Sequence, residues 1–147
     1  MWIVVLLLLS FCGNRPDFSA TVIDQATPPV RRATKGWVSF FVKDNAIAYE
    51  MELTGFRPLD SAFLHLGAIE HLGPPVALLY PRDKDQARGS KPSQNLAVRG
   101  TIRTADLKGP LQGDPLDSLV SSMQRRRTYV SMVLGGALGG VIRGEVR

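Results

Sequence analysis

Apolar and polar residues alternate along most of the chain, and this pattern predicts β-strands. In residues 46–54, AIAYEMELT, large apolar residues occupy every second position, so one face of the predicted strand is buried and the other solvated. Residues 36–43, GWVSFFVK, are rich in β-branched and aromatic residues, and Lys43-Asp44-Asn45 connects the two runs as a tight hairpin. Further strands are predicted near 20–23 and at 62–66, 76–80, 96–104, 128–134 and 140–147.

One short helix is predicted at residues 115–126. Asp114 is expected as its N-cap, with Pro115 in the first turn. Apolar residues then recur at the i, i+3, i+4, i+7 spacing that gives a helix one buried stripe. The stripe consists of Leu116, Leu119, Val120 and Met123.

About seven short strands with one helix favour an all-β sandwich or barrel. Ten Pro and fourteen Gly supply the turns that such folds need. Strands crossing between two sheets are expected to bury Trp37, Phe41, Tyr49, Leu53 and Ile142.

The N-terminal residues have the pattern of an export signal. Residues 2–9, WIVVLLLL, are all apolar. Even counted through Gly13, a helix here is about 18 Å long, against about 30 Å for the bilayer core. Its length suits a secretory signal, although no Lys or Arg precedes it, and a buried N-terminal strand is the alternative. We divide the chain into a signal segment at 1–12, a linker at 13–35 and one domain at 36–147.

The single cysteine, Cys12, lies at the end of the signal segment. Cleavage after Cys12 would give a secreted chain. Alternatively, Leu9-Ser10-Phe11-Cys12 partly resembles a bacterial lipoprotein signal, in which Cys12 becomes lipidated and holds the chain at the cell surface. Either outcome predicts a secreted or surface location, with membrane contact only through the signal or the lipid anchor. Neither permits an internal disulfide.

A series of motifs along the domain resembles a known family. In chain order they are Gly36–Phe40, Tyr49–Gly55, Ala62–Gly67, Leu72–Val76, Gly100–Leu107, Tyr129–Val133 and Gly140–Gly144. Their order and content resemble the chordin-type (CHRD) domain. The resemblance implies a Greek-key β-sandwich, superoxide-dismutase-like or immunoglobulin-like, within an extracellular protein.

The chain departs from the family pattern at positions that carry polar side chains in the family. Phe63 and Val133 replace two family histidines, and Val141 replaces a glutamate, whereas His65 and Arg143 are retained. In chordin itself, such domains belong to an extracellular antagonist of growth-factor signalling. That ligand is not carried over to this chain.

Few residues are available for metal or nucleophilic chemistry. The chain has two histidines, so a multi-histidine copper centre is excluded within one chain. A mixed site of His65, His71 and Glu70 is the remaining metal alternative, with His65 as the weak candidate. The competing interpretation makes His65 a hydrogen-bonded strand residue and His71 an exposed loop residue. No Gly-x-Ser-x-Gly turn is present, and neither a catalytic residue nor a cofactor is predicted.

Arg143 has two interpretations. It is either a structural guanidinium, paired with a carboxylate such as Glu52 or Asp106 or with backbone carbonyls, or an anion-binding group beside the glycine-rich segment at 135–140.

Three functions follow from these observations. The first is a non-enzymatic exported module that binds an extracellular protein or a surface polymer. The second is a degenerate metal-dependent redox enzyme of superoxide-dismutase-like fold. The third is a polyanion-binding surface protein, which the net charge of +5 would favour. The basic residues considered for that contact are Arg31, Arg32, Lys35 and Arg125–Arg127. Nucleic acid is not expected as a partner.

Overall fold

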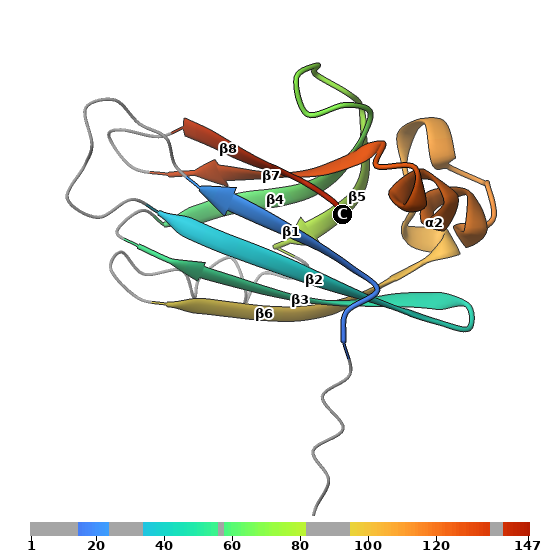
Figure 1. The fold of residues 1–147 in the computed structure, drawn as a ribbon, viewed down its shortest axis with the longest axis horizontal. Helices are drawn as coiled ribbons and strands as arrows, with labels where there is room; N and C mark the ends of the chain where they lie inside the picture. The colour runs from blue at the N-terminus through green and yellow to red at the C-terminus, as the bar shows by residue number, and fades with distance from the viewer. Residues whose placement is uncertain (1–14, 24–33, 56–57, 82–94, 136–139) are drawn as a thin grey trace, which may run out of the picture.

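The computed structural model of the chain describes residues 15–23, 34–55, 58–81, 95–135 and 140–147. These residues form two antiparallel sheets packed face to face, with one short α-helix at one end (Figure 1). The prediction of an all-β sandwich is therefore confirmed. The signal segment with Cys12, the basic residues Arg31 and Arg32, and most of the glycine-rich segment lie outside the described residues.

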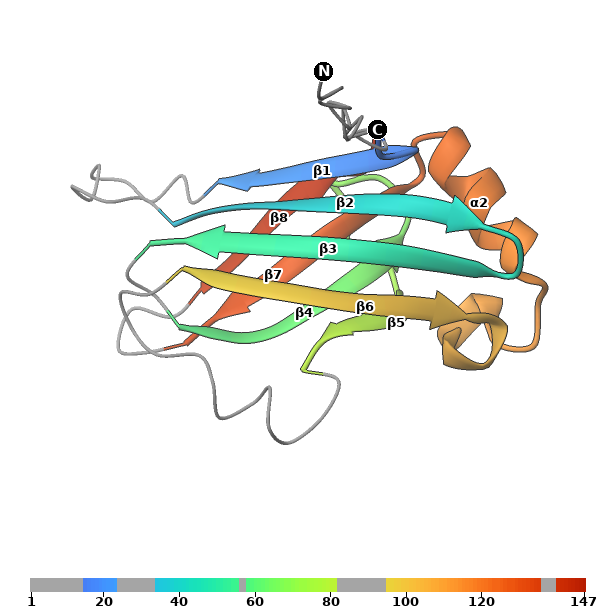
Figure 2. The same cartoon turned by 90° about the horizontal axis from the view of Figure 1, so that it is seen from below.

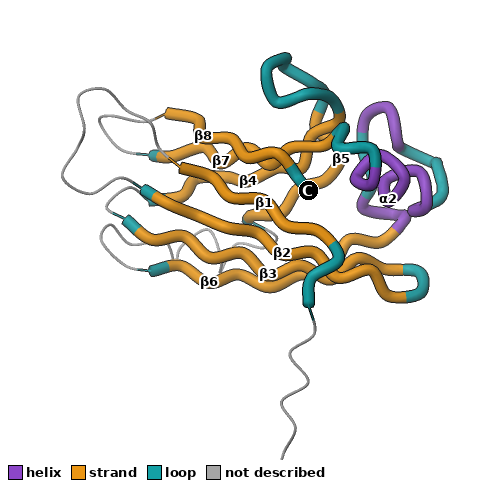
Figure 3. The backbone as a smooth tube through the Cα atoms, viewed as in Figure 1, coloured by secondary structure: helices purple, strands orange, loops and turns teal. Residues whose placement is uncertain are grey.

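Each sheet has four strands, and strands that are neighbours in a sheet are not all consecutive in the chain (Figures 2 and 3). The first sheet has the order β1 (Phe18–Ile23), β2 (Lys35–Lys43), β3 (Ala46–Thr54), β6 (Leu96–Arg103). The second has the order β5 (Pro75–Tyr80), β4 (Leu59–Leu66), β7 (Thr128–Leu134), β8 (Gly140–Glu145). The chain thus crosses between sheets to bring β6 beside β3 and β7 beside β4, as in Greek-key sandwiches.

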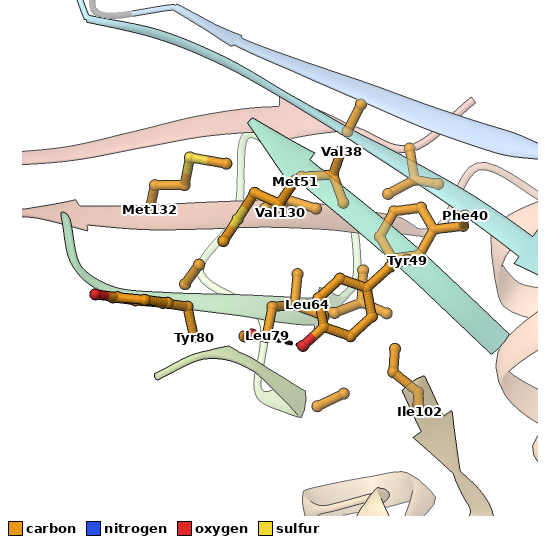
Figure 4. Packing of buried hydrophobic residues seen from close by; sticks show 14 of the residues in the cluster. Val38, Phe40, Tyr49, Met51, Leu64, Leu79, Tyr80, Ile102, Val130 and Met132 are labelled. Carbon is orange, nitrogen blue, oxygen red and sulfur yellow. Dashed lines mark hydrogen bonds between the residues drawn. The ribbon is translucent and has the colours of Figure 1, made fainter. Parts of the chain in front are cut away.

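The core lies between the sheets and follows the predicted alternation in β3. Tyr49 and Met51 are each 1% exposed; Met51 lies beside Val130 of the opposite sheet, and the Tyr49 ring reaches Leu79 there (Figure 4). Leu53 and Ile142 are buried as well.

The expectation that Trp37 and Phe41 are buried in the core is wrong. Trp37 is 43% exposed and Phe41 is only partly buried, while Val38 and Phe40 are fully buried. The hairpin register explains the difference, because it pairs Phe40 with Tyr49. Directly opposed residues share a face, so the even-numbered residues of β2 point inward.

A helical segment closes one end of the sandwich. It comprises η1 (Thr104–Asp106), η2 (Gly109–Leu111) and α2 (Leu116–Gln124) (Figure 1). Three residues of the predicted apolar stripe are buried and the fourth, Val120, is partly buried. The prediction of Asp114 as N-cap is wrong, because Pro115 takes the extended cap conformation and the helix begins at Leu116 without a side-chain cap.

The two sheets also meet along one edge, where β1 lies beside β8. Ser19 and Arg147 exchange two backbone hydrogen bonds, of 2.8 and 2.9 Å. Gly144 allows this approach, because a Cβ there would collide with the Thr21 carbonyl. We call this edge the seam. Because β1 pairs with β2 over Phe18–Ile23, the sandwich includes residues that precede residue 36.

Candidate functional site

The outer face of the second sheet brings together the polar residues singled out in the sequence. The strand register places Phe63, Ser131 and Arg143 in one row across β4, β7 and β8. The next row contains His65, Tyr129 and Glu145. Alternate residues of these strands face the core, so both rows lie on the side away from it.

His65 is held at both ring nitrogens. Its Nδ1 lies 2.8 Å from the Gly73 carbonyl oxygen, and its Nε2 lies 2.7 Å from Ser131 Oγ. A carbonyl oxygen only accepts, so Nδ1 carries a proton, and in the neutral ring Nε2 accepts from the Ser131 hydroxyl. The interpretation of His65 as a hydrogen-bonded strand residue is confirmed.

The same contacts fix the loop that follows β4, residues 67–74. Gly73 N donates to Tyr129 Oη at 2.9 Å, so both backbone polar groups of Gly73 are bonded. The Tyr129 ring stacks on His65 with centroids 4.8 Å apart and 7° between planes. Only glycine fits at position 73, because a Cβ there would overlap the Leu66 carbonyl oxygen. We call His65, Gly73, Tyr129 and Ser131 the loop clamp.

The clamp has the order of groups found in nucleophilic enzymes: a serine, a histidine base and an acceptor that orients the base. A substrate, however, must reach the serine oxygen. Ser131 is only 4% exposed. The geometry therefore supports a structural task, which is to hold the loop on the sheet. Sequence reasoning did not single out Ser131.

The residues of the mixed metal site do not converge. His71 and Glu70 are exposed on the loop, whereas both nitrogens of His65 are engaged by protein groups. Within the part of the chain that the structure describes, no three His, Cys, Asp or Glu side chains are grouped to hold a metal ion.

A cavity of about 460 Å³ lies over the seam. We call it the seam pocket. Its floor comes from β1 and β8, and its wall from the clamped loop. The lining residues are Ser19, Thr21, Ile23, Ile69, Glu70, Arg143, Gly144, Glu145 and Arg147.

The charged groups of the seam pocket are only partly paired. Arg147 Nε and Glu145 Oε2 form an ion pair at 2.9 Å. Arg143 is half-buried, and among the described residues its guanidinium makes no ion pair or hydrogen bond. The predicted pairing of Arg143 with Glu52 or Asp106 is therefore wrong. Glu52 is an exposed residue of β3, in the other sheet.

Comparison of the chain with protein-family models, with curated proteins and with solved structures finds no match. The chordin-type family thus stays a prediction carried by the motifs. Among the described residues, none of the helices has the length and hydropathy needed to cross a bilayer.

The departures from the chordin-type pattern fall on one surface. Phe63, Val133 and Val141 all lie on the outer face of the second sheet, as do His65 and Arg143. Apolar residues therefore occupy three positions around the clamp, and Val141 is 51% exposed. Arg143 and Glu145 of β8 add charged groups to the same face, at the seam pocket.

Proposed function

We propose that this chain is an exported, non-enzymatic binding module of chordin type, which acts by contact with an extracellular protein or surface polymer. The seam pocket is its ligand site. The location rests on the apolar N-terminal segment, and the module type on the motif order and the β-sandwich.

The observation that carries this proposal is the unpaired Arg143 guanidinium in the seam pocket. Arg143 is partly buried in the sheet surface, and proteins normally give the guanidinium of such a side chain a carboxylate or carbonyl partner. No such partner is present among the described residues. A bound acidic group supplies the missing hydrogen bonds and charge.

The clamped loop adds a second argument. Binding sites gain affinity when their walls are ordered before the ligand arrives, because less conformational entropy is lost. Ile69 and Glu70 form the wall of the pocket, and the loop that carries them is fixed through Gly73. A pocket with a preformed wall suits a binding module.

The two other functions have less support. An enzyme needs reacting groups that substrate can reach, and Ser131 in the clamp is buried. Polyanion contact needs a continuous basic surface. Lys35 begins β2 at the end of the sandwich opposite α2, whereas Arg125–Arg127 follow α2 (Figure 2). These basic residues do not form one patch.

The proposal is tested by retention of the purified chain on the cell-envelope fraction of the producing cells. Arg143→Ala is expected to lower retention about tenfold, the usual scale for losing one charge-assisted contact. Arg99→Ala is the matched control, because the Arg99 side chain is 83% exposed and, among the described residues, pairs only with Glu50, at 3.2 Å. That control is expected to bind like the unmodified chain.

Both variants are expected to keep the midpoint of thermal unfolding, since neither removes a buried contact. Equal retention of Arg143→Ala and the unmodified chain, with the fold intact, would remove the seam pocket as the ligand site.

A further inference from the structure

An exposed tryptophan borders the seam pocket. Thr21, which lines the pocket, is directly opposite Trp37 in the pairing of β1 with β2. Opposed residues on one face have Cβ atoms about 5 Å apart. Trp37 is 43% exposed, which is unusual for the largest apolar side chain of a sheet. Trp37 does not line the pocket itself, but its pairing with Thr21 places an exposed aromatic side chain next to the pocket's β1 edge.

The polar groups of the pocket suit a ligand with many hydroxyls. The side chains of Ser19 and Thr21 are exposed and have no hydrogen-bond partner among the described residues. Their hydroxyls both donate and accept, the Glu70 carboxylate accepts, and the Arg143 guanidinium donates. Sugar hydroxyls need this mixture of donors and acceptors, and the C–H face of a sugar ring packs on an aromatic ring.

The seam is poorly suited to an extended peptide. A peptide usually binds a sheet by pairing with a free strand edge. Here Ser19 of β1 already exchanges backbone hydrogen bonds with Arg147. The backbone edge of β1 is therefore already hydrogen-bonded beside the pocket, and a peptide cannot pair with it there.

A densely charged polyanion is also disfavoured. Glu70 and Glu145 line the pocket together with Arg143 and Arg147. Two carboxylates would repel closely spaced sulfates or phosphates. A ligand with isolated acidic groups avoids this repulsion.

We infer that the ligand is an acidic polysaccharide with well-separated carboxylates, an inference that rests on the proposed function. One carboxylate binds the Arg143 guanidinium, and a neighbouring sugar ring packs on Trp37. Hydroxyls of the polymer bond to Ser19 and Thr21.

The probe is the envelope polysaccharide of the producing cells, freed of protein by protease digestion. It is used in two forms, native and with its carboxyl groups reduced to alcohols. The full chain is expected to bind the native form and to lose about tenfold in affinity for the reduced form. Trp37→Ala is expected to weaken binding to the native form several-fold. Leu72→Ala is the control, because Leu72 is an 84% exposed apolar residue that neither lines the pocket nor pairs with a lining residue in the sheet.

Equal binding of the native and reduced polysaccharides would overturn the inference, as would equal binding by Trp37→Ala and Leu72→Ala. If protease destroys the binding material while Arg143→Ala still weakens binding to the untreated envelope, the polysaccharide is wrong and the proposed function stands. If Arg143→Ala binds the untreated envelope and the isolated polysaccharide as tightly as the unmodified chain does, both the proposed function and the inferred ligand are wrong.

Discussion

Tyr49 Oη of β3 donates a 2.6 Å hydrogen bond to the carbonyl oxygen of Leu79 in β5, and so ties the two sheets together (Figure 4). Both residues are almost fully buried. Gly100 makes room for the ring, because a Cβ at that position would overlap the Tyr49 hydroxyl. The bond lies at one side of the sandwich, because Leu79 belongs to the edge strand β5 and Tyr49 pairs with Gly100 of the edge strand β6.

Removing this hydroxyl is expected to weaken the sandwich. Tyr49→Phe keeps the ring but leaves the buried Leu79 carbonyl without this donor, which should cost about 1–2 kcal/mol in the free energy of unfolding. Urea denaturation measures the loss, with an unchanged slope showing that the folded state is the same. An unaltered midpoint would mean that the bond does not stabilise the fold.

Two buried hydroxyls on β7 should respond in opposite ways to removal. Thr128 Oγ1 has no hydrogen-bond partner in the part of the chain that the structure describes, whereas Ser131 Oγ bonds to His65. Thr128→Val is therefore expected to be neutral or to stabilise by up to about 1 kcal/mol. Ser131→Ala should destabilise by about 1–2 kcal/mol, because it leaves a ring nitrogen of His65 unpaired. Thermal unfolding of the two variants gives the comparison, and the same loss in both would contradict it.

The loop clamp depends on a glycine. Gly73→Ala should destabilise the chain by more than about 2 kcal/mol, because the added methyl overlaps the Leu66 carbonyl and pushes the loop off the sheet. Gly113→Ala is the control: its φ of +84° imposes strain, but nothing lies within 4 Å of the added atom. About 1 kcal/mol is expected there. The difference between the two variants in urea denaturation isolates the steric term, and equal losses would refute the clamp.

The core was predicted better in β3 than in β2. Alternation in 46–54 correctly placed Tyr49 inward. The hairpin was expected to turn over Lys43-Asp44-Asn45, but Lys43 pairs with Ala46 and the turn has two residues, Asp44-Asn45. The shorter turn pairs Phe40 with Tyr49 and Trp37 with Glu52, so Phe40 lies inside and Trp37 outside. A three-residue turn would shift the register by one residue and exchange the two faces of β2, and the expectation that Trp37 and Phe41 are buried agrees with that longer turn.

The site was less predictable than the fold. His65 was recognised, but its partner Ser131 lies 66 residues further along the chain. Their contact depends on the pairing of β4 with β7, two strands that are not consecutive. No local pattern specifies which distant strands become neighbours. The same holds for the seam, where Ser19 meets Arg147.

The central claim is that the seam pocket with Arg143 is the ligand site, and chemical-shift mapping tests it most directly. The ¹⁵N-labelled chain is titrated with the protease-treated envelope polysaccharide. The account predicts that the amide signals of Thr21 and Ile69 and the side-chain signal of Arg143 shift together, while Arg99 on the first sheet stays unchanged. Shifts confined to the outer face of β3 and β6, or no shifts at all, would contradict it.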